Sequence, residues 1–133
     1  MFTNESVVGL VYAQFLRAGN EQLFSVIAYC FMPDHVHLLV EGLREDSDLK
    51  CFQSAAKQYS GFYYKQTFGQ ALWQRYGYER VLRSEDHTMD LIRYILANPV
   101  RAGLAKSMNG YPFSGSGVVS LEELMDGLQV ESG

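Results

Sequence analysis

The sequence predicts an α+β domain in which helices cover an antiparallel β-sheet. Some segments repeat their apolar residues at helical spacing, and others alternate apolar with polar residues or form short β-rich runs. The order of these segments is helix, strand, strand, helix, strand, helix. The length of 133 residues, with 47% apolar and 20% charged residues, suits a single domain over residues 1–133 with one core.

A helix and a β-hairpin are predicted in the first third of the chain. Asn4 can cap a helix that runs to about Leu16, and Gly19-Asn20 is expected to end it, because both residue types are favoured beyond helix C-termini. Residues 23–31 are rich in β-forming side chains and are followed by the turn residues Pro33-Asp34. The alternating segment that comes next completes the predicted hairpin.

One more strand and three more helices are predicted in the rest of the chain. Ser and Asp side chains that can accept hydrogen bonds from a first helical turn mark the starts of the larger helices. The expected elements are a helix from Ser47 or Asp48 to Phe68 with Gly61 as a candidate interruption, a loop at 73–77, a strand at 78–83, a helix from Ser84 to Asn98 stopped by Pro99, and a short helix at 120–128.

The charge is distributed unevenly along the chain. The net charge of -4 argues at first against a nucleic-acid partner, because phosphate contacts need Lys and Arg. Residues 50–106, however, hold 9 basic and 4 acidic residues and 10 of the 18 aromatic residues. Interleaved basic and aromatic side chains are typical of single-stranded nucleic-acid binding. Most of these aromatics, including Phe52, Phe62 and Trp73, are nevertheless expected to be core residues.

Cysteine spacing and hydropathy exclude several classes of protein. Cys30 and Cys51 show no CxxC spacing, so neither a zinc ribbon nor a disulfide framework is indicated, and both are expected to be buried, reduced thiols. No apolar run approaches the roughly 18 to 20 residues that a membrane span needs, and Met1 to Gly9 does not resemble a signal peptide. The sequence thus predicts a cytoplasmic protein with no membrane partner.

Two histidines in the predicted hairpin form a candidate metal site. On a strand, residues two apart point to one face with about 6.6 to 7 Å between them, so His35 and His37 can converge on one metal ion. Their apolar neighbours would point to the opposite face. An HxH pair can also arise by chance on a solvated strand. Metal-dependent barrel hydrolases carry the same pair, but such a barrel typically needs about 250 residues.

Tyr94 is the candidate nucleophile of the last large helix. A helical wheel of residues 89–98 gathers the apolar side chains into one arc and leaves Tyr94 outside it, beside Asn98 one turn later. A phenol oxygen can attack phosphorus and later act as a leaving group, and the Asn98 carbonyl could reach the metal of the histidines. The alternative is a half-exposed tyrosine that only covers its neighbours.

These residues resemble the single-tyrosine HUH transposases, and among them the branch of REP-associated tyrosine transposases. The resemblance covers about residues 22–116. HUH stands for two histidines around a hydrophobic residue, here His35-Val36-His37 within the stretch from Met32 to Val40. The further matching stretches, in order, are Leu72-Trp73-Gln74-Arg75, Gly77-Tyr78, Val81-Leu82-Arg83, the run from Tyr94 to Leu104, and Tyr111-Pro112-Phe113-Ser114.

The resemblance implies a fold and a chemistry. The fold would be a ferredoxin-like, RRM-like sandwich whose antiparallel sheet carries the HUH histidines. His35, His37 and Asn98 would bind Mg²⁺ or Mn²⁺, which polarises the scissile phosphate. Tyr94 would cut and rejoin single-stranded, hairpin-forming DNA through a 5′-phosphotyrosine intermediate. The arginines expected to contact phosphate are Arg75, Arg80, Arg83, Arg93 and Arg101.

Two departures from the family pattern leave alternatives open. Family members normally begin with a β-strand before the first helix, whereas this sequence predicts a helix almost at its start, and an isoelectric point near 5.3 is low for a transposase. The first alternative is a catalytically inactive, single-stranded DNA-binding remnant of such a transposase. A replication or conjugation nickase, which would need further domains, and a plain metal-binding domain are the others. An uncovered sheet edge would also favour a homodimer.

Overall fold

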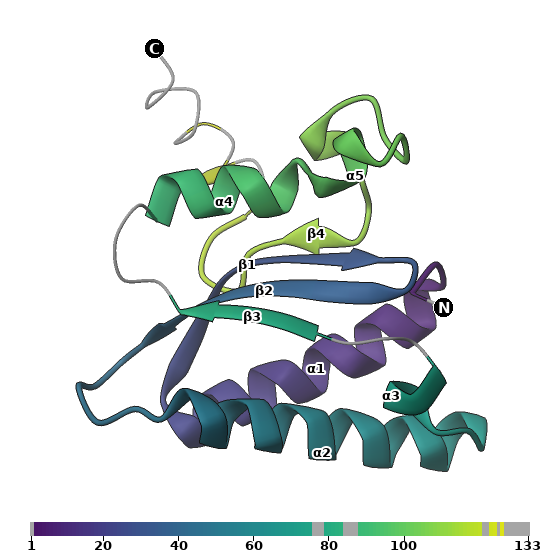
Figure 1. Cartoon of the computed structure of the whole chain (residues 1–133), viewed down its shortest axis with the longest axis vertical. Helices are drawn as coiled ribbons and strands as arrows, with labels where there is room; N and C mark the ends of the chain where they lie inside the picture. The colour runs from purple at the N-terminus through teal and green to yellow at the C-terminus, as the bar shows by residue number, and fades with distance from the viewer. Residues whose placement is uncertain (1, 76–78, 84–87, 121–122, 125, 127–133) are drawn as a thin grey trace.

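The computed structural model describes residues 2–75, 79–83, 88–120, 123, 124 and 126, except for the side chains of residues 74, 75, 79, 80 and 82. One four-stranded sheet, in the order β3-β2-β1-β4, has helices on both faces, with α1 and α2 on one and α4 on the other (Figure 1). This arrangement confirms the predicted α+β class. The elements are α1 (Glu5–Gln22), β1 (Phe24–Met32), β2 (His35–Gly42), α2 (Leu49–Phe68), α3 (Leu72–Arg75), β3 (Glu79–Arg83), α4 (Thr88–Leu96), α5 (Asn98–Arg101), the 3-10 turn η1 (Met108–Gly110) and β4 (Ser114–Gly115).

The sheet is antiparallel except at one pairing. β1 pairs antiparallel with β2 in the predicted hairpin, and β4 adds to the other edge of β1, also antiparallel. β3 instead runs parallel to β2, which differs from the wholly antiparallel sheet that the sequence predicted. The reason lies in the connection, because α2 and α3 carry the chain back along the sheet between the two strands, as parallel neighbours require.

α1 is longer than predicted. Asn4 caps it as expected, since its Oδ1 accepts a hydrogen bond of 2.7 Å from the Ser6 amide. The helix passes through Gly19-Asn20 and ends only at Leu23, whose φ of 62° places it in the left-handed region. Gly19 therefore serves packing, because a Cβ there would lie 2.7 Å from the Phe24 carbonyl oxygen. The prediction that Gly19-Asn20 ends the helix was wrong.

α2 begins and ends where the sequence predicted, but the segment after it differs from the prediction. The Asp48 side chain accepts from the Lys50 and Cys51 amides as an N-cap, and Gly61 does not interrupt the helix. The expected loop at 73–77 begins instead with the short helix α3, and its later part lies outside the described residues. So do the proposed cap Ser84 and most of the predicted C-terminal helix. No described helix is long and apolar enough to cross a membrane.

A β-bulge in β1 decides which side chains face α4. The register shifts between Val26 and Ala28, so that Val26 packs with the α1 side while Ala28, Cys30 and Met32 join the core under α4. β2 has no such shift, and Val36, Leu38 and Val40 all face the α1 and α2 side. The odd-numbered residues of β2, the two histidines among them, are left for the α4 side.

Candidate functional site

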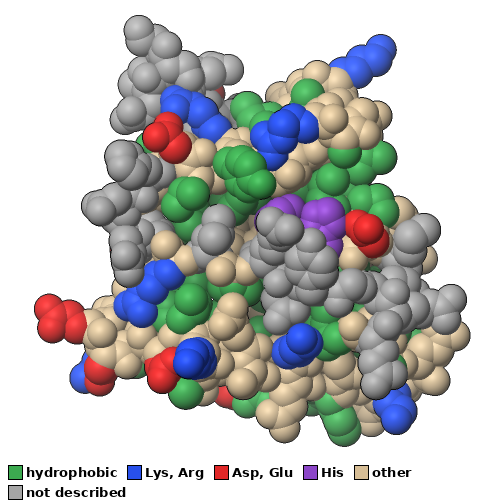
Figure 2. Space-filling model, viewed as in Figure 1, with side chains coloured by type: hydrophobic (Ala, Val, Ile, Leu, Met, Phe, Trp, Pro, Cys, Tyr) green, Lys and Arg blue, Asp and Glu red, His purple; other side chains and the backbone are tan. Residues whose placement is uncertain are grey.

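The two HUH histidines lie together at the start of β2. The Nε2 atoms of His35 and His37 are 3.0 Å apart, and the two rings meet edge to face. His37 is buried, with 4% of its surface exposed, whereas 24% of the His35 side chain is exposed. In Figure 2 the histidine side chains (purple) reach the surface of the face shown, beside an acidic side chain (red) and below Lys and Arg side chains (blue).

Asp34 orients His35, a contact that sequence reasoning missed. Its Oδ1 lies 2.7 Å from His35 Nδ1, and this hydrogen bond holds the pKa of the Asp34 carboxyl below its ordinary value. When Nδ1–H donates to Asp34, the other nitrogen of His35 presents a lone pair toward His37. The sequence treated Asp34 as a turn residue, although a carboxylate next to a metal-site histidine is a known signal.

The donor atoms of the histidine pair fit a divalent ion. A contact of 3.0 Å between two imidazole nitrogens requires a proton or a cation between or beside them. Two nitrogens in neighbouring octahedral positions, each about 2.1 Å from the metal, would be about 3.0 Å apart. Among the described residues, no group of three or more His, Cys, Asp or Glu side chains could hold a metal.

α4 brings Tyr94 to the histidines. Ile92, Ile95 and Leu96 are buried against the sheet, as the predicted apolar arc requires, and Tyr94 lies outside that arc with 47% of its surface exposed. Its ring centroid is 6.3 Å from that of His37, and the two ring planes are nearly perpendicular. The sequence predicted that Tyr94 lies outside the core face of its helix, and the fold places His37 next to it.

Arg101 links Tyr94 to Asn98. Its guanidinium carbon lies 4.7 Å from the centroid of the Tyr94 ring, and Nη2 donates hydrogen bonds of 2.9 Å to the Tyr94 carbonyl and to Asn98 Oδ1. Asn98 Nδ2 in turn donates to the Ile95 carbonyl. The Asn98 amide is thus held in one orientation, and its oxygen, which already accepts from Arg101, keeps a second lone pair.

The other predicted DNA-contacting arginines differ in their surroundings. Arg83 donates to the Ser47 carbonyl at 3.0 Å and lies over the Phe24 ring, so its guanidinium ties β3 to the start of α2. Arg93 pairs with Asp90 at 3.5 Å on α4. The side chains of Arg75 and Arg80 lie outside the described residues. Arg101 contacts Tyr94 directly.

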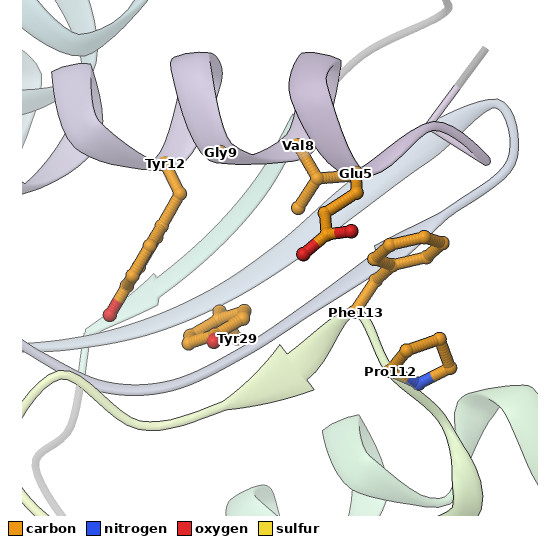
Figure 3. Close-up of a pocket in the computed structure, with 7 residues that line it drawn as sticks. All are labelled: Glu5, Val8, Gly9, Tyr12, Tyr29, Pro112 and Phe113. Atoms are coloured by element: carbon orange, nitrogen blue, oxygen red, sulfur yellow. The ribbon is translucent and has the colours of Figure 1, made fainter.

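A separate pocket of about 450 Å³ lies between α1 and the chain that leads into β4 (Figure 3). The Tyr12 and Tyr29 rings approach within 4.2 Å of each other there, and Glu5 and Phe113 complete its walls. The described residues that line this pocket include none of the predicted site residues. The histidine and tyrosine cluster therefore lies in a different place from this cavity.

Comparisons with known proteins show the family of the chain. The family model described as "Transposase IS200 like" matches residues 1–98. The chain is also 28% identical over 105 residues to a protein of Haemophilus influenzae (strain Rd) that is named as a REP-associated tyrosine transposase. That match covers 68% of this chain and 58% of the relative, so the chain spans little more than half of the relative's length. No solved structure matches the chain. Since the family match extends over most of its length, the chain belongs to the IS200-like transposase family.

Proposed function

We propose that the chain cuts and rejoins single-stranded, hairpin-forming DNA, with Tyr94 as the nucleophile and His35, His37 and Asn98 as ligands of Mg²⁺ or Mn²⁺. The observation that carries the proposal is the convergence of two imidazole nitrogens, 3.0 Å apart, beside the half-exposed Tyr94. Membership of a transposase family supports DNA as the substrate.

The chemistry assigns each side chain a task. The Tyr94 oxygen attacks the scissile phosphorus and forms a P–O bond to the enzyme, while the P–O3′ bond breaks. The phenol proton leaves to solvent, and the departing 3′ oxygen takes up a proton to become a hydroxyl. The bound divalent ion would polarise the phosphate and offset its charge. Attack of a 3′-hydroxyl on the phosphotyrosine then reverses the reaction and releases Tyr94.

Arg101 holds Tyr94 in position for the proposed reaction. A cation over the Tyr94 ring and two hydrogen bonds to its surroundings fix the position of the phenol on the helix. The same guanidinium can turn a free N–H toward a phosphate oxygen, since it has five donors in all. Arg101 is thus the arginine that best suits a phosphate contact at the proposed reaction centre.

A covalent adduct tests the function. The protein is incubated with labelled single-stranded hairpins from its own flanking DNA and Mn²⁺, and a labelled band at the mass of protein plus DNA is expected in denaturing gels. Tyr94→Phe removes only the phenol oxygen and should abolish the band without changing the folded state, whereas Tyr78→Phe should keep it. An adduct that survives Tyr94→Phe would show that another residue is the nucleophile. If the unmodified protein forms no adduct with either metal, the inactive DNA-binding alternative is the better description.

Self-association is a further part of the proposal. Within the described sheet, β3 and β4 are the edge strands, and β3 pairs with β2 alone. An edge with unpaired backbone groups favours pairing with a second chain, and two copies would supply two nucleophiles for two DNA ends. Light scattering at high protein concentration should give the mass of a dimer, and a monomer mass would remove this part.

A further inference from the structure

The outer face of α2 carries charge of one sign. Its 20 residues include three lysines, Lys50, Lys57 and Lys65, and no Asp or Glu, in a chain whose net charge is -4. All three lysines are exposed. At 100° and 1.5 Å per residue they lie within an arc of about 80° and span about 22 Å of the helix. This stripe is long enough to follow several phosphates of one nucleic-acid strand.

One exposed aromatic side chain, Phe62, lies next to the lysine stripe, one helical turn before Lys65. Phe62 has 60% of its surface exposed, although the sequence favoured a core position for it. It lines a pocket of about 260 Å³ together with Arg17, Gln58, Tyr59 and Tyr63, and its ring meets that of Tyr63 at 5.2 Å. An aromatic face exposed in this way is available for a nucleic-acid base to stack on.

Glu21 contacts two of the residues that line this pocket. Glu21 pairs with Arg17 at 3.3 Å and also accepts a hydrogen bond from the Tyr59 hydroxyl. The Arg17 guanidinium in turn lies 4.0 Å over the Tyr59 ring, which closes one wall of the pocket. Phe62 is left as an exposed aromatic face one helical turn from Lys65, and an aromatic face beside a basic side chain is the combination that binds single-stranded nucleic acid.

We infer that the outer face of α2, formed by Lys57, Phe62 and Lys65, is a second binding surface for single-stranded DNA. Phosphates lie along the lysines and a base stacks on Phe62. α2 covers one face of the sheet and α4 the other (Figure 1), so this surface is on the opposite side of the sheet from Tyr94. It would therefore hold a stretch of the strand away from the cleaved bond. This inference rests on the proposed DNA substrate and extends it.

Binding of a fluorescent oligodeoxythymidine of about 30 nucleotides, followed by anisotropy over a salt series, tests the surface. Phe62→Ala should weaken binding about tenfold, the loss of one base stack. The double variant Lys57→Gln with Lys65→Gln should make the slope of log affinity against log salt shallower by about 0.7 per lysine. The controls Val118→Ala, an exposed apolar side chain outside α2, and Lys106→Gln should leave both quantities near the wild-type values.

Photocrosslinking gives an independent readout. With iododeoxyuridine in the same oligonucleotide, the crosslinked peptide should contain Phe62 and Tyr63. Unchanged affinity and salt slope in the α2 variants, with crosslinks elsewhere in the chain, would overturn the inference. So would variants that change the oligomeric mass and leave DNA binding intact, since α2 would then contact a second copy.

Adduct formation on a short hairpin separates this inference from the proposed function. If the α2 variants bind oligodeoxythymidine as the wild type does and the wild type forms the adduct, the surface is wrong and the function stands. If the wild type forms no adduct, yet the α2 variants lose oligodeoxythymidine binding, the cleavage function is wrong and the surface stands.

Discussion

The guanidinium of Arg101 lies over the ring of Tyr94, 4.7 Å from its centroid, and reaches past it to Asn98 Oδ1. One side chain thus contacts both the proposed nucleophile, Tyr94, and a proposed metal ligand, Asn98. These contacts depend on the planar, forked shape of the guanidinium, which a lysine ammonium cannot reproduce.

Arg101→Lys is expected to slow adduct formation about tenfold, because it keeps the charge but loses the stacking and one of two hydrogen bonds, together worth about 1 to 2 kcal/mol. Initial rates of adduct formation on a hairpin substrate measure this. Arg44→Lys is the control, since Arg44 pairs with Asp46 at 3.1 Å, is not among the arginines expected to contact DNA and should tolerate the change. Equal rates for Arg101→Lys and the wild type would contradict the role given to Arg101.

Asp34→Asn is expected to weaken Mn²⁺ binding about 10- to 100-fold, because the carboxylate that fixes and polarises His35 through Nδ1 would be lost. Titration of Mn²⁺ followed by electron paramagnetic resonance gives the affinity without any need for DNA. Asp46→Asn is the control. The Asp46 side chain is about as exposed as that of Asp34, but it forms an ion pair with Arg44 and not with a histidine. An affinity that Asp34→Asn leaves unchanged would show that the Asp34 contact does not serve a metal.

The two cysteines should react differently with iodoacetamide. Burial raises the pKa of the Cys30 thiol to about 12, so almost no thiolate forms at pH 8, while Cys51 is exposed on α2. Mass spectrometry of the native protein should find one modified thiol, and two after unfolding in urea. Cys51→Ser should leave none in the native state. Rapid modification of Cys30 in the folded protein would mean that the core between β1 and α4 opens readily. The sequence had predicted that both thiols are buried, which is wrong for Cys51.

Two glycines of α1 should respond in opposite directions to alanine. Gly9→Ala meets no atom within 4 Å and should raise the free energy of unfolding by about 0.5 to 1 kcal/mol. Gly19→Ala places a Cβ 2.7 Å from the Phe24 carbonyl oxygen and should lower it by about 1 to 3 kcal/mol. Urea denaturation followed by circular dichroism measures both. A stabilising Gly19→Ala would mean that α1 and β1 can separate at no cost.

The sequence by itself determined the features that depend on short-range geometry. The alternation in β2 sends His35 and His37 to one face because successive strand residues point to opposite faces. The caps Asn4 and Asp48 and the apolar arc of α4 likewise follow from spacing within a single element. For the same reason the position of Tyr94 outside that arc was predictable before any tertiary contact was known.

Only the tertiary structure decided which distant residues meet. Gly19 leaves room for the Phe24 carbonyl oxygen inside a helix that continues to Gln22, and β3 runs parallel to β2 because α2 returns the chain along the sheet. Arg83, which the sequence suggested as a DNA contact, donates a hydrogen bond to the Ser47 carbonyl. Phe62, which the sequence suggested as a core residue, is exposed. Local periodicity carries no information on such pairs, because each depends on how whole elements pack across many residues of intervening chain.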